Sequence, residues 1–299
     1  MVFVEERLRA LGRLSPTIPS SAEARLLFLP VREPTAAATS WKNGYLALFT
    51  LGLFELLRTH ATASVWAGML ANVESHLGTT LEQGRRVRDY LNLRTLLYFC
   101  GRSSLPNLEA VVSPAVRTKG LVSAEAACLF VILHEYGHAA YGALDRSGRE
   151  QFAASVRLVT PEELNSAKLE ELYADRFALT CIPTAAHGVL IHASTLFFTL
   201  QAFAEEHGLA RSDYHPSAKN RLAALLSYAE GAKHTEDLDL GPATRQFAKL
   251  GSPKEAEGVG RQAAFGHRLD GLEHVADALE ASLGWRESVA SVCRLAESF

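Results

Sequence analysis

An apolar segment that ends in two histidines constrains this chain more than any other feature of its sequence. Residues 126–133 read Ala-Ala-Cys-Leu-Phe-Val-Ile-Leu, and His134-Glu-Tyr-Gly-His138 follows directly. The pattern predicts a helix over residues 123–144. Because the approach to the histidines is apolar throughout, we expect this helix, and the motif on it, to be buried.

The spacing of the two histidines suits one metal ion. In a helix, residues four apart differ by about 40° around the axis and about 6 Å along it, so His134 and His138 present their imidazoles on one face. That arrangement is suited to a tetrahedral Zn²⁺. Glu135 then lies beside the ion without binding it, where a general base can take a proton from metal-bound water.

A catalytic zinc keeps three protein ligands and one open position, so a third ligand is required. Glu171 is the candidate, on the next predicted helix. Asp175 lies one turn later on the same face and could accept the second N–H of a ligand histidine. Glu170 is the rival ligand, although it points about 100° away from Glu171 and has no acid four residues later.

Other interpretations of these residues stay open. His134 and His138 could be core histidines bonded to backbone carbonyls, and Glu171 could be a solvated helix glutamate. Alternatively, a metal at this position could have a purely structural role and hold helices together in a non-catalytic interaction protein. Glu135 argues against that alternative, because a structural site has no use for a base and usually closes its fourth position.

Composition limits the partners and the compartment. The 30 basic and 33 acidic residues are spread along the chain without a polybasic block, so a nucleic-acid partner is not expected. Four separated cysteines and a start without a secretory pattern predict a cytoplasmic protein. Residues 45–57 and 185–204 are apolar but interrupted by polar side chains, which favours buried helices over membrane spans. Peripheral membrane contact and a membrane-associated processing protease remain alternatives.

We expect three segments: a mostly helical part over 1–110, a core over 111–230, and a loop with C-terminal helices over 231–299. Residues 25–30 and 108–116 are the predicted strands, and a loop is expected at 145–150. A capping box of Thr160, Pro161 and Glu163 is expected to start one helix. Further helices are predicted over residues 1–14, 41–77, 80–100, 184–207 and 216–230.

Three motifs occur in order: His134-Glu-x-x-His138, Glu171-x-x-Ala-Asp175 and His215-Pro-Ser-x-x-x-Arg221-Leu. The trio resembles the gluzincin peptidases of the CAAX-prenyl-protease and HtpX type, and is similar to that of the soluble Lit-type phage-exclusion peptidases. The resemblance implies a mainly α (α+β), zincin-like domain with at most a small edge sheet. It also implies a zinc-dependent endopeptidase that hydrolyses a peptide bond in a protein or peptide substrate.

The resemblance also gives roles to two residues of the third motif. It implies that His215 lies near the open zinc position and donates to the developing oxyanion, while Arg221 supports the site through a carboxylate such as Asp175. The residues agree in part, because Pro216 in the first turn of a helix would make His215 its N-cap. A surface histidine in a helix-start turn is the alternative.

Overall fold

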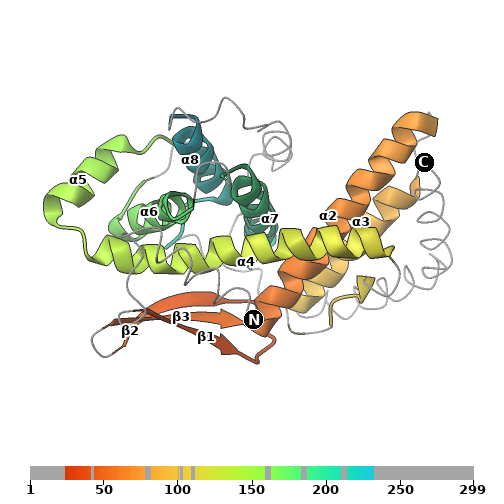
Figure 1. The fold of residues 1–299 in the computed structure, drawn as a ribbon, viewed down its shortest axis with the longest axis horizontal. Helices are drawn as coiled ribbons and strands as arrows, with labels where there is room; N and C mark the ends of the chain where they lie inside the picture. Colours follow the sequence, from red (N-terminus) through yellow and green to blue (C-terminus); the bar gives the residue numbers. More distant parts are fainter. Residues whose placement is uncertain are drawn as a thin grey trace. The chain divides into compact units, whose positions relative to one another are not determined.

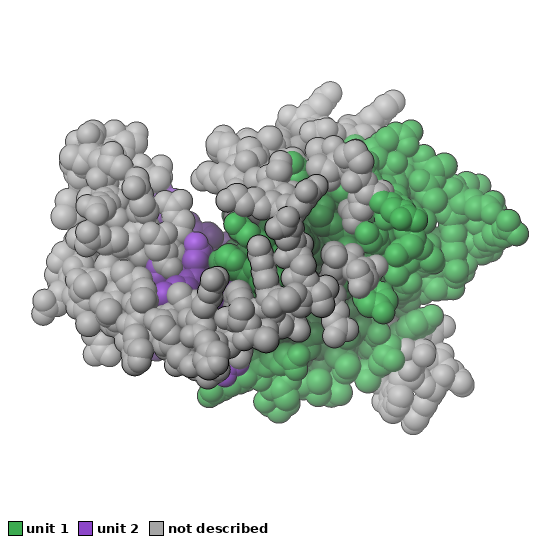
Figure 2. All heavy atoms as spheres, turned by 180° about the vertical axis from the view of Figure 1, so that it is seen from behind, with its two compact units in different colours: residues 1–54, 125–254 green, residues 55–124, 255–299 purple. Residues whose placement is uncertain are grey.

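A computed structural model describes residues 24–41, 44–77, 82–99, 101, 104–108, 112–158, 163–182, 187–209 and 214–231. The helices predicted at the two ends of the chain lie outside these residues. Contacts divide the chain into two compact units, residues 1–54 with 125–254 and residues 55–124 with 255–299 (Figure 2). The three segments expected from the sequence stay a prediction.

The described residues are mainly helical with one small sheet, as predicted. The sheet has the strand order β1-β3-β2 (Figure 1). Strand β1 (Ala24–Leu29) pairs in parallel with β3 (Gly44–Thr50), which pairs antiparallel with β2 (Ala36–Trp41). Strand β1 confirms the strand predicted over residues 25–30.

The helix predicted over residues 41–77 begins later, because its first part belongs to the sheet. Residues 44–50 form β3, and α2 (Leu51–Leu77) starts directly after it. A short apolar run looks the same in a buried strand and in a buried helix. Ala47 and Phe49, two apart, are both about 1% exposed, which is the alternation of a strand.

The strand predicted over residues 108–116 is wrong where the structure describes it. Pro114 is the first residue of α4 (Pro114–Gly142), and the backbone at Leu108 is helical, not extended. The hydroxyl of Ser113 accepts a hydrogen bond from the N–H of Val116 at 3.3 Å. Serine followed by proline is a helix-start signal, and it outweighs the strand preference of the flanking valines.

Helix α4 also begins before residue 123, the start predicted from the sequence, and its second part lies in the first unit. There it packs against α6 (Ser166–Thr180) and α7 (His187–Glu206). Its Phe130 ring lies 5.6 Å from the ring of Phe198 on α7. A Cβ atom on Gly137 would lie 2.5 Å from Cα of Ala174 on α6. Glycine at 137 therefore lets α4 and α6 approach closely, which brings a short carboxylate on α6 within reach of the histidines.

Two predicted boundaries near α6 are corrected. Residues 145–150 are not a loop, because Asp145 caps α5 (Arg146–Ser155) by accepting the N–H of Gly148 at 2.7 Å. Helix α6 does not begin with the predicted capping box of residues 160–163. Asn165 is its N-cap and accepts the N–H of Lys168 at 2.9 Å, while Glu163 precedes the helix. Asparagine is among the residue types favoured at this position.

Helix α7 ends before Gly208, as predicted, and this glycine has a φ of 67°. Helix α8 (Ala218–Gly231) starts two residues later than expected, so His215 is not its N-cap. The N–H of Asn220 donates to the hydroxyl of Ser217 at 3.3 Å, and that of Ala218 donates to Glu205 of α7 at 3.0 Å. These two acceptors fix the helix start after Pro216.

The second unit contains most of α2, α3 (Glu82–Phe99) and the first part of α4. Helix α3 confirms the helix predicted near residues 80–100. The partly buried His60 of α2 lies 2.7 Å from the hydroxyl of Thr95 on α3, and desolvation lowers the pKa of His60 to about 4. Among the described residues, no helix combines the length and apolar character that crossing a membrane requires.

Candidate metal centre

His134 and His138 of α4 aim their Nε2 atoms at one carboxylate, that of Glu171 on α6. The Nε2 atom of His134 lies 3.3 Å from Oε2 of Glu171, and that of His138 lies 3.5 Å from Oε1. The two imidazole rings are nearly perpendicular, at 87°. The packing of α4 on α6 thus brings together the three side chains predicted to bind the metal.

This donor set fits a zinc ion. Ligand atoms about 2.0–2.1 Å from a tetrahedral zinc are about 3.3 Å apart, close to both nitrogen–oxygen distances. Oε2 of Glu171 is buried and makes no hydrogen bond of acceptable geometry to the described residues, although His215 and Arg221 are also near it. A buried carboxylate oxygen without a partner is costly, and a cation held by these donors would satisfy it.

The other ring nitrogen of each histidine meets a carboxylate. Nδ1 of His134 lies 2.9 Å from Asp175, and Nδ1 of His138 lies 3.0 Å from Glu170. An N–H donated from Nδ1 leaves Nε2 free to bind a metal. The sequence suggested Glu170 only as a rival ligand. A ligand histidine needs a hydrogen-bond partner for its second ring nitrogen, and this requirement was the signal that could have placed Glu170 beside His138.

Arg221 of α8 supports the cluster from within the core. It is 2% exposed, and its guanidinium donates to both carboxylate oxygens of Asp175, at 2.8 and 2.7 Å. It also donates to Gln201 of α7 at 3.0 Å, and its Nη2 lies 3.4 Å from Glu171. The sequence resemblance implied a contact between Arg221 and Asp175, and the structure places the two side chains in this bidentate pair.

The charges of the cluster set the pKa values of its members. Burial works to lower the pKa of His134, but the nearby carboxylates of Asp175 and Glu171 outweigh burial and raise it to about 10. Burial works to raise the pKa values of the Glu171 and Asp175 carboxyl groups. The nearby Arg221 guanidinium outweighs burial and keeps both pKa values below their usual range. The carboxylates are therefore ionised, and a bound cation would replace the proton on His134.

Glu135 is buried beside the histidines. One of its carboxylate oxygens and one nitrogen of each histidine lie within 4.8 Å of one another, so distance alone also allows Glu135 as a ligand. Glu171 lies closer to both histidines, at 3.3 and 3.5 Å, and we favour it as the ligand for that reason. Burial raises the pKa of Glu135 to about 7, a value suited to a general base.

His215 lies at the edge of the cluster, just before α8. Its side chain is 47% exposed, and its Nδ1 is 3.0 Å from Oε2 of Glu171. Helix α7 holds this segment, because Gln201 donates to the carbonyl of Pro216 at 3.5 Å and Glu205 caps α8. Sequence reasoning missed Gln201 and Glu205. Their signal was two polar residues four apart, on one side of the last turns of a largely apolar helix.

Two imidazoles with two buried carboxyl groups beside them can serve a metal-dependent hydrolase. Comparison with known families points to hydrolysis of peptide bonds, because residues 116–238 match the model of the family Peptidase U49, a Lit-type peptidase family. The matched segment includes every residue of the metal centre described above, and it supports a peptidase function. Searches of curated proteins and of solved structures each found no match.

Proposed function

We propose that this protein is a zinc-dependent endopeptidase acting on a protein substrate. The observation that carries the proposal is the convergence of His134, His138 and Glu171, with Glu135 buried beside them. The match to a peptidase family supports it. In this proposal the three side chains hold Zn²⁺, which when bound polarises the scissile carbonyl and lowers the pKa of water.

The protein's own residues then carry the proton and the charge. Glu135 takes a proton from the attacking water as its oxygen bonds to the carbonyl carbon, and delivers that proton to the leaving amine as the C–N bond breaks. His215 donates a hydrogen bond to the developing oxyanion. Asp175 and Glu170 keep the two imidazoles oriented, and Arg221 balances the charge of Asp175.

The ligand assignment predicts zinc contents that differ between neighbouring glutamates. Purified protein should bind about one zinc per chain, and Glu171→Gln should remove most of it, because the ligand oxygen is lost. Glu170→Gln should weaken affinity by about 10- to 100-fold, the usual cost of losing a partner to a ligand histidine. Competition with a chromogenic chelator measures these affinities.

The control for these variants is Glu163→Gln, an exposed residue before α6, which should bind zinc like the wild type. Removing zinc with a chelator should also lower the melting temperature, because the ion joins α4 to α6 and binds only the folded chain. If Glu135→Gln loses zinc and Glu171→Gln keeps it, the roles of ligand and base assigned to these two residues are exchanged.

The role of His215 predicts a loss of rate without a loss of metal. His215→Phe should keep zinc and the fold but lower kcat by about 10²-fold, the cost of losing one oxyanion donor. Steady-state kinetics on a substrate cut by the wild type gives kcat and KM separately. Tyr214→Phe is the matched control, because this neighbour is 60% exposed and has no role in the proposal. An unchanged kcat in His215→Phe would leave this histidine only a structural part in the turn.

We also propose a reducing, cytoplasmic location. Cys128 and Cys181 are buried and unpaired. Burial raises the pKa of the Cys128 thiol well above its usual range, and raises that of Cys181 to about 12. Both thiols are therefore inert core groups, as in proteins whose thiols remain reduced. Fractionation of cells that produce the protein tests this location and distinguishes it from membrane association.

A further inference from the structure

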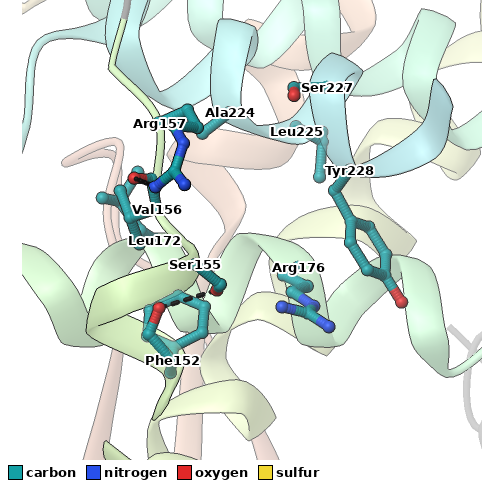
Figure 3. A pocket seen from close by; sticks show the side chains of 10 residues that line it. All are labelled: Phe152, Ser155, Val156, Arg157, Leu172, Arg176, Ala224, Leu225, Ser227 and Tyr228. Atoms are coloured by element: carbon teal, nitrogen blue, oxygen red, sulfur yellow. Dashed lines mark hydrogen bonds between the residues drawn. The ribbon is translucent and has the colours of Figure 1, made fainter. Parts of the chain in front are cut away.

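A pocket of about 390 Å³ lies between α5, α6 and α8, and no residue of the metal centre lines it (Figure 3). Three buried apolar side chains form its floor: Phe152, Leu172 and Leu225. Its rim is polar and more exposed, and includes Ser155, Arg157, Arg176, Ser227 and Tyr228. An apolar floor with a few polar groups at the rim is the usual composition of a ligand pocket.

The pocket and the metal centre use different parts of the same two helices. Arg176 directly follows Asp175 on α6, so its side chain is turned about 100° away from that residue. On α8 the pocket residues begin at Ala224, one turn after Arg221. The mechanism proposed above uses none of the pocket residues, so the pocket requires its own explanation.

In the part of the chain that the structure describes, the charged side chains that line this pocket are all of one sign. They are Arg157 and Arg176, and none of the described lining residues is acidic. Among the described residues, Arg176 has no carboxylate partner, and its guanidinium lies 4.2 Å from the centre of the Tyr228 ring. One nitrogen of Arg157 donates to the carbonyls of Ala154 and Val156, both at 3.0 Å, which holds this side chain in place.

Figure 3 shows the two arginines on different elements that line the pocket, Arg157 on the segment after α5 and Arg176 on α6. Contacts with Tyr228 and with backbone carbonyls position both groups in advance. A guanidinium offers paired donors that match the two oxygens of a carboxylate. Positioned guanidinium groups, with no acid among the described lining residues, favour an anionic ligand.

We propose that this pocket binds a carboxylate joined to one compact apolar group. The apolar group would lie on Phe152, Leu172 and Leu225, and the carboxylate would bind between Arg157 and Arg176. A volume of about 390 Å³ is near the lower end for ligand pockets, so the occupant is small. The C-terminal residue of a peptide and a free acid share this chemistry.

The test uses the full chain and three probes that separate charge from shape. N-acetylphenylalanine carries the carboxylate, N-acetylphenylalanine amide has the same shape without the charge, and acetyl-triglycyl-phenylalanine presents the group at a peptide terminus. Calorimetry should show the acid binding at least tenfold more tightly than the amide. Tighter binding of the tetrapeptide than of the free acid identifies a peptide terminus as the source, and the reverse order identifies a small acid.

Variants connect this binding to the pocket. Arg176→Gln should weaken binding of the acid at least tenfold, whereas Arg146→Gln, on α5 and 93% exposed, should have no effect. Since Arg176→Gln also removes the contact with Tyr228, Ser227→Phe provides a second variant that fills the pocket from its exposed rim. It should abolish binding while the melting temperature stays near that of the wild type.

A carboxylate can also bind a zinc ion, so each titration is run with zinc and after chelation. Binding of the acid that survives both pocket variants and disappears on chelation belongs to the metal centre and overturns the proposal. Equal binding of acid and amide overturns the role of the two arginines. Absence of binding by all three probes at millimolar concentration overturns the pocket as a site for this ligand class.

Discussion

A Glu135→Gln protein should keep its zinc and its fold but lose its peptidase activity by about 10²- to 10⁴-fold or more. Glutamine preserves the shape of the side chain, but its amide cannot take a proton from water. Glu171 lies closer than Glu135 to both histidines, so the metal ligands remain. Water at the metal would then lack a positioned proton acceptor, which is why the expected loss is so large.

The stability of this variant follows from the sign of a pKa shift. Burial raises the pKa of Glu135 to about 7, so ionising this carboxyl costs the folded state free energy once the pH exceeds the ordinary value of a glutamate. A neutral glutamine removes that cost. The melting temperature of zinc-free Glu135→Gln at neutral pH should therefore equal or exceed that of the zinc-free wild type.

Labelling of new protein N-termini across the proteome, after brief expression of each form, measures the activity without a known substrate. Termini that appear with the wild type and not with Glu135→Gln are cleavage products. Full activity of Glu135→Gln on such a substrate would contradict the mechanism. If the wild type binds zinc but cuts nothing, and both forms have the same biological effect, the metal serves a non-catalytic interaction protein.

Helical periodicity was enough to group the residues of the candidate site, because a helix fixes which side chains share a face. His134 and His138 must share a face when four residues apart, and Glu171 and Asp175 must do so on the next helix. The close approach of α4 and α6 depends on Gly137, which sequence reasoning did not consider. Partners from other helices were harder to predict, because contacts such as that of Gln201 with Arg221 depend on tertiary packing.

The errors in the fold arise where two local signals compete. Residues 44–50 are apolar and short, and only pairing on both sides shows that they form the central strand. Ser113 and Pro114 begin a helix within a segment whose valines favour a strand. Helix α8 also starts later than Pro216 suggested. The N–H of Ala218 at its start donates to Glu205 on α7, and this contact between two helices is not visible in the local sequence.

The buried charges of the site depend on one another. Asp175 orients His134, and Arg221 compensates Asp175 while also lying near Glu171. Asp175 and Arg221 are each about 2% exposed, so water cannot take the place of a missing partner. The position of His134 therefore depends on an arginine that would not itself touch the metal.

Arg221→Met should destabilise the protein by about 3–5 kcal/mol, because it leaves the carboxylates of Asp175 and Glu171 buried without their compensating charge. Zinc affinity should fall about 10- to 100-fold, since Asp175 then holds His134 less firmly. Arg221→Lys should have an intermediate effect, because an ammonium keeps the charge but cannot make the bidentate contact. Urea unfolding of the zinc-free proteins measures the stability term, and chelator competition measures the affinity.

A double variant separates the ion pair from a simple loss of packing. If Arg221 acts mainly by compensating Asp175, combining Arg221→Met with Asp175→Asn should cost clearly less than the sum of the two single changes. If it acts mainly by filling space between α6, α7 and α8, the two costs should add. Additive costs, or a loss below about 1 kcal/mol for Arg221→Met alone, would contradict the role assigned here, since a buried carboxylate without its partner cannot be that inexpensive.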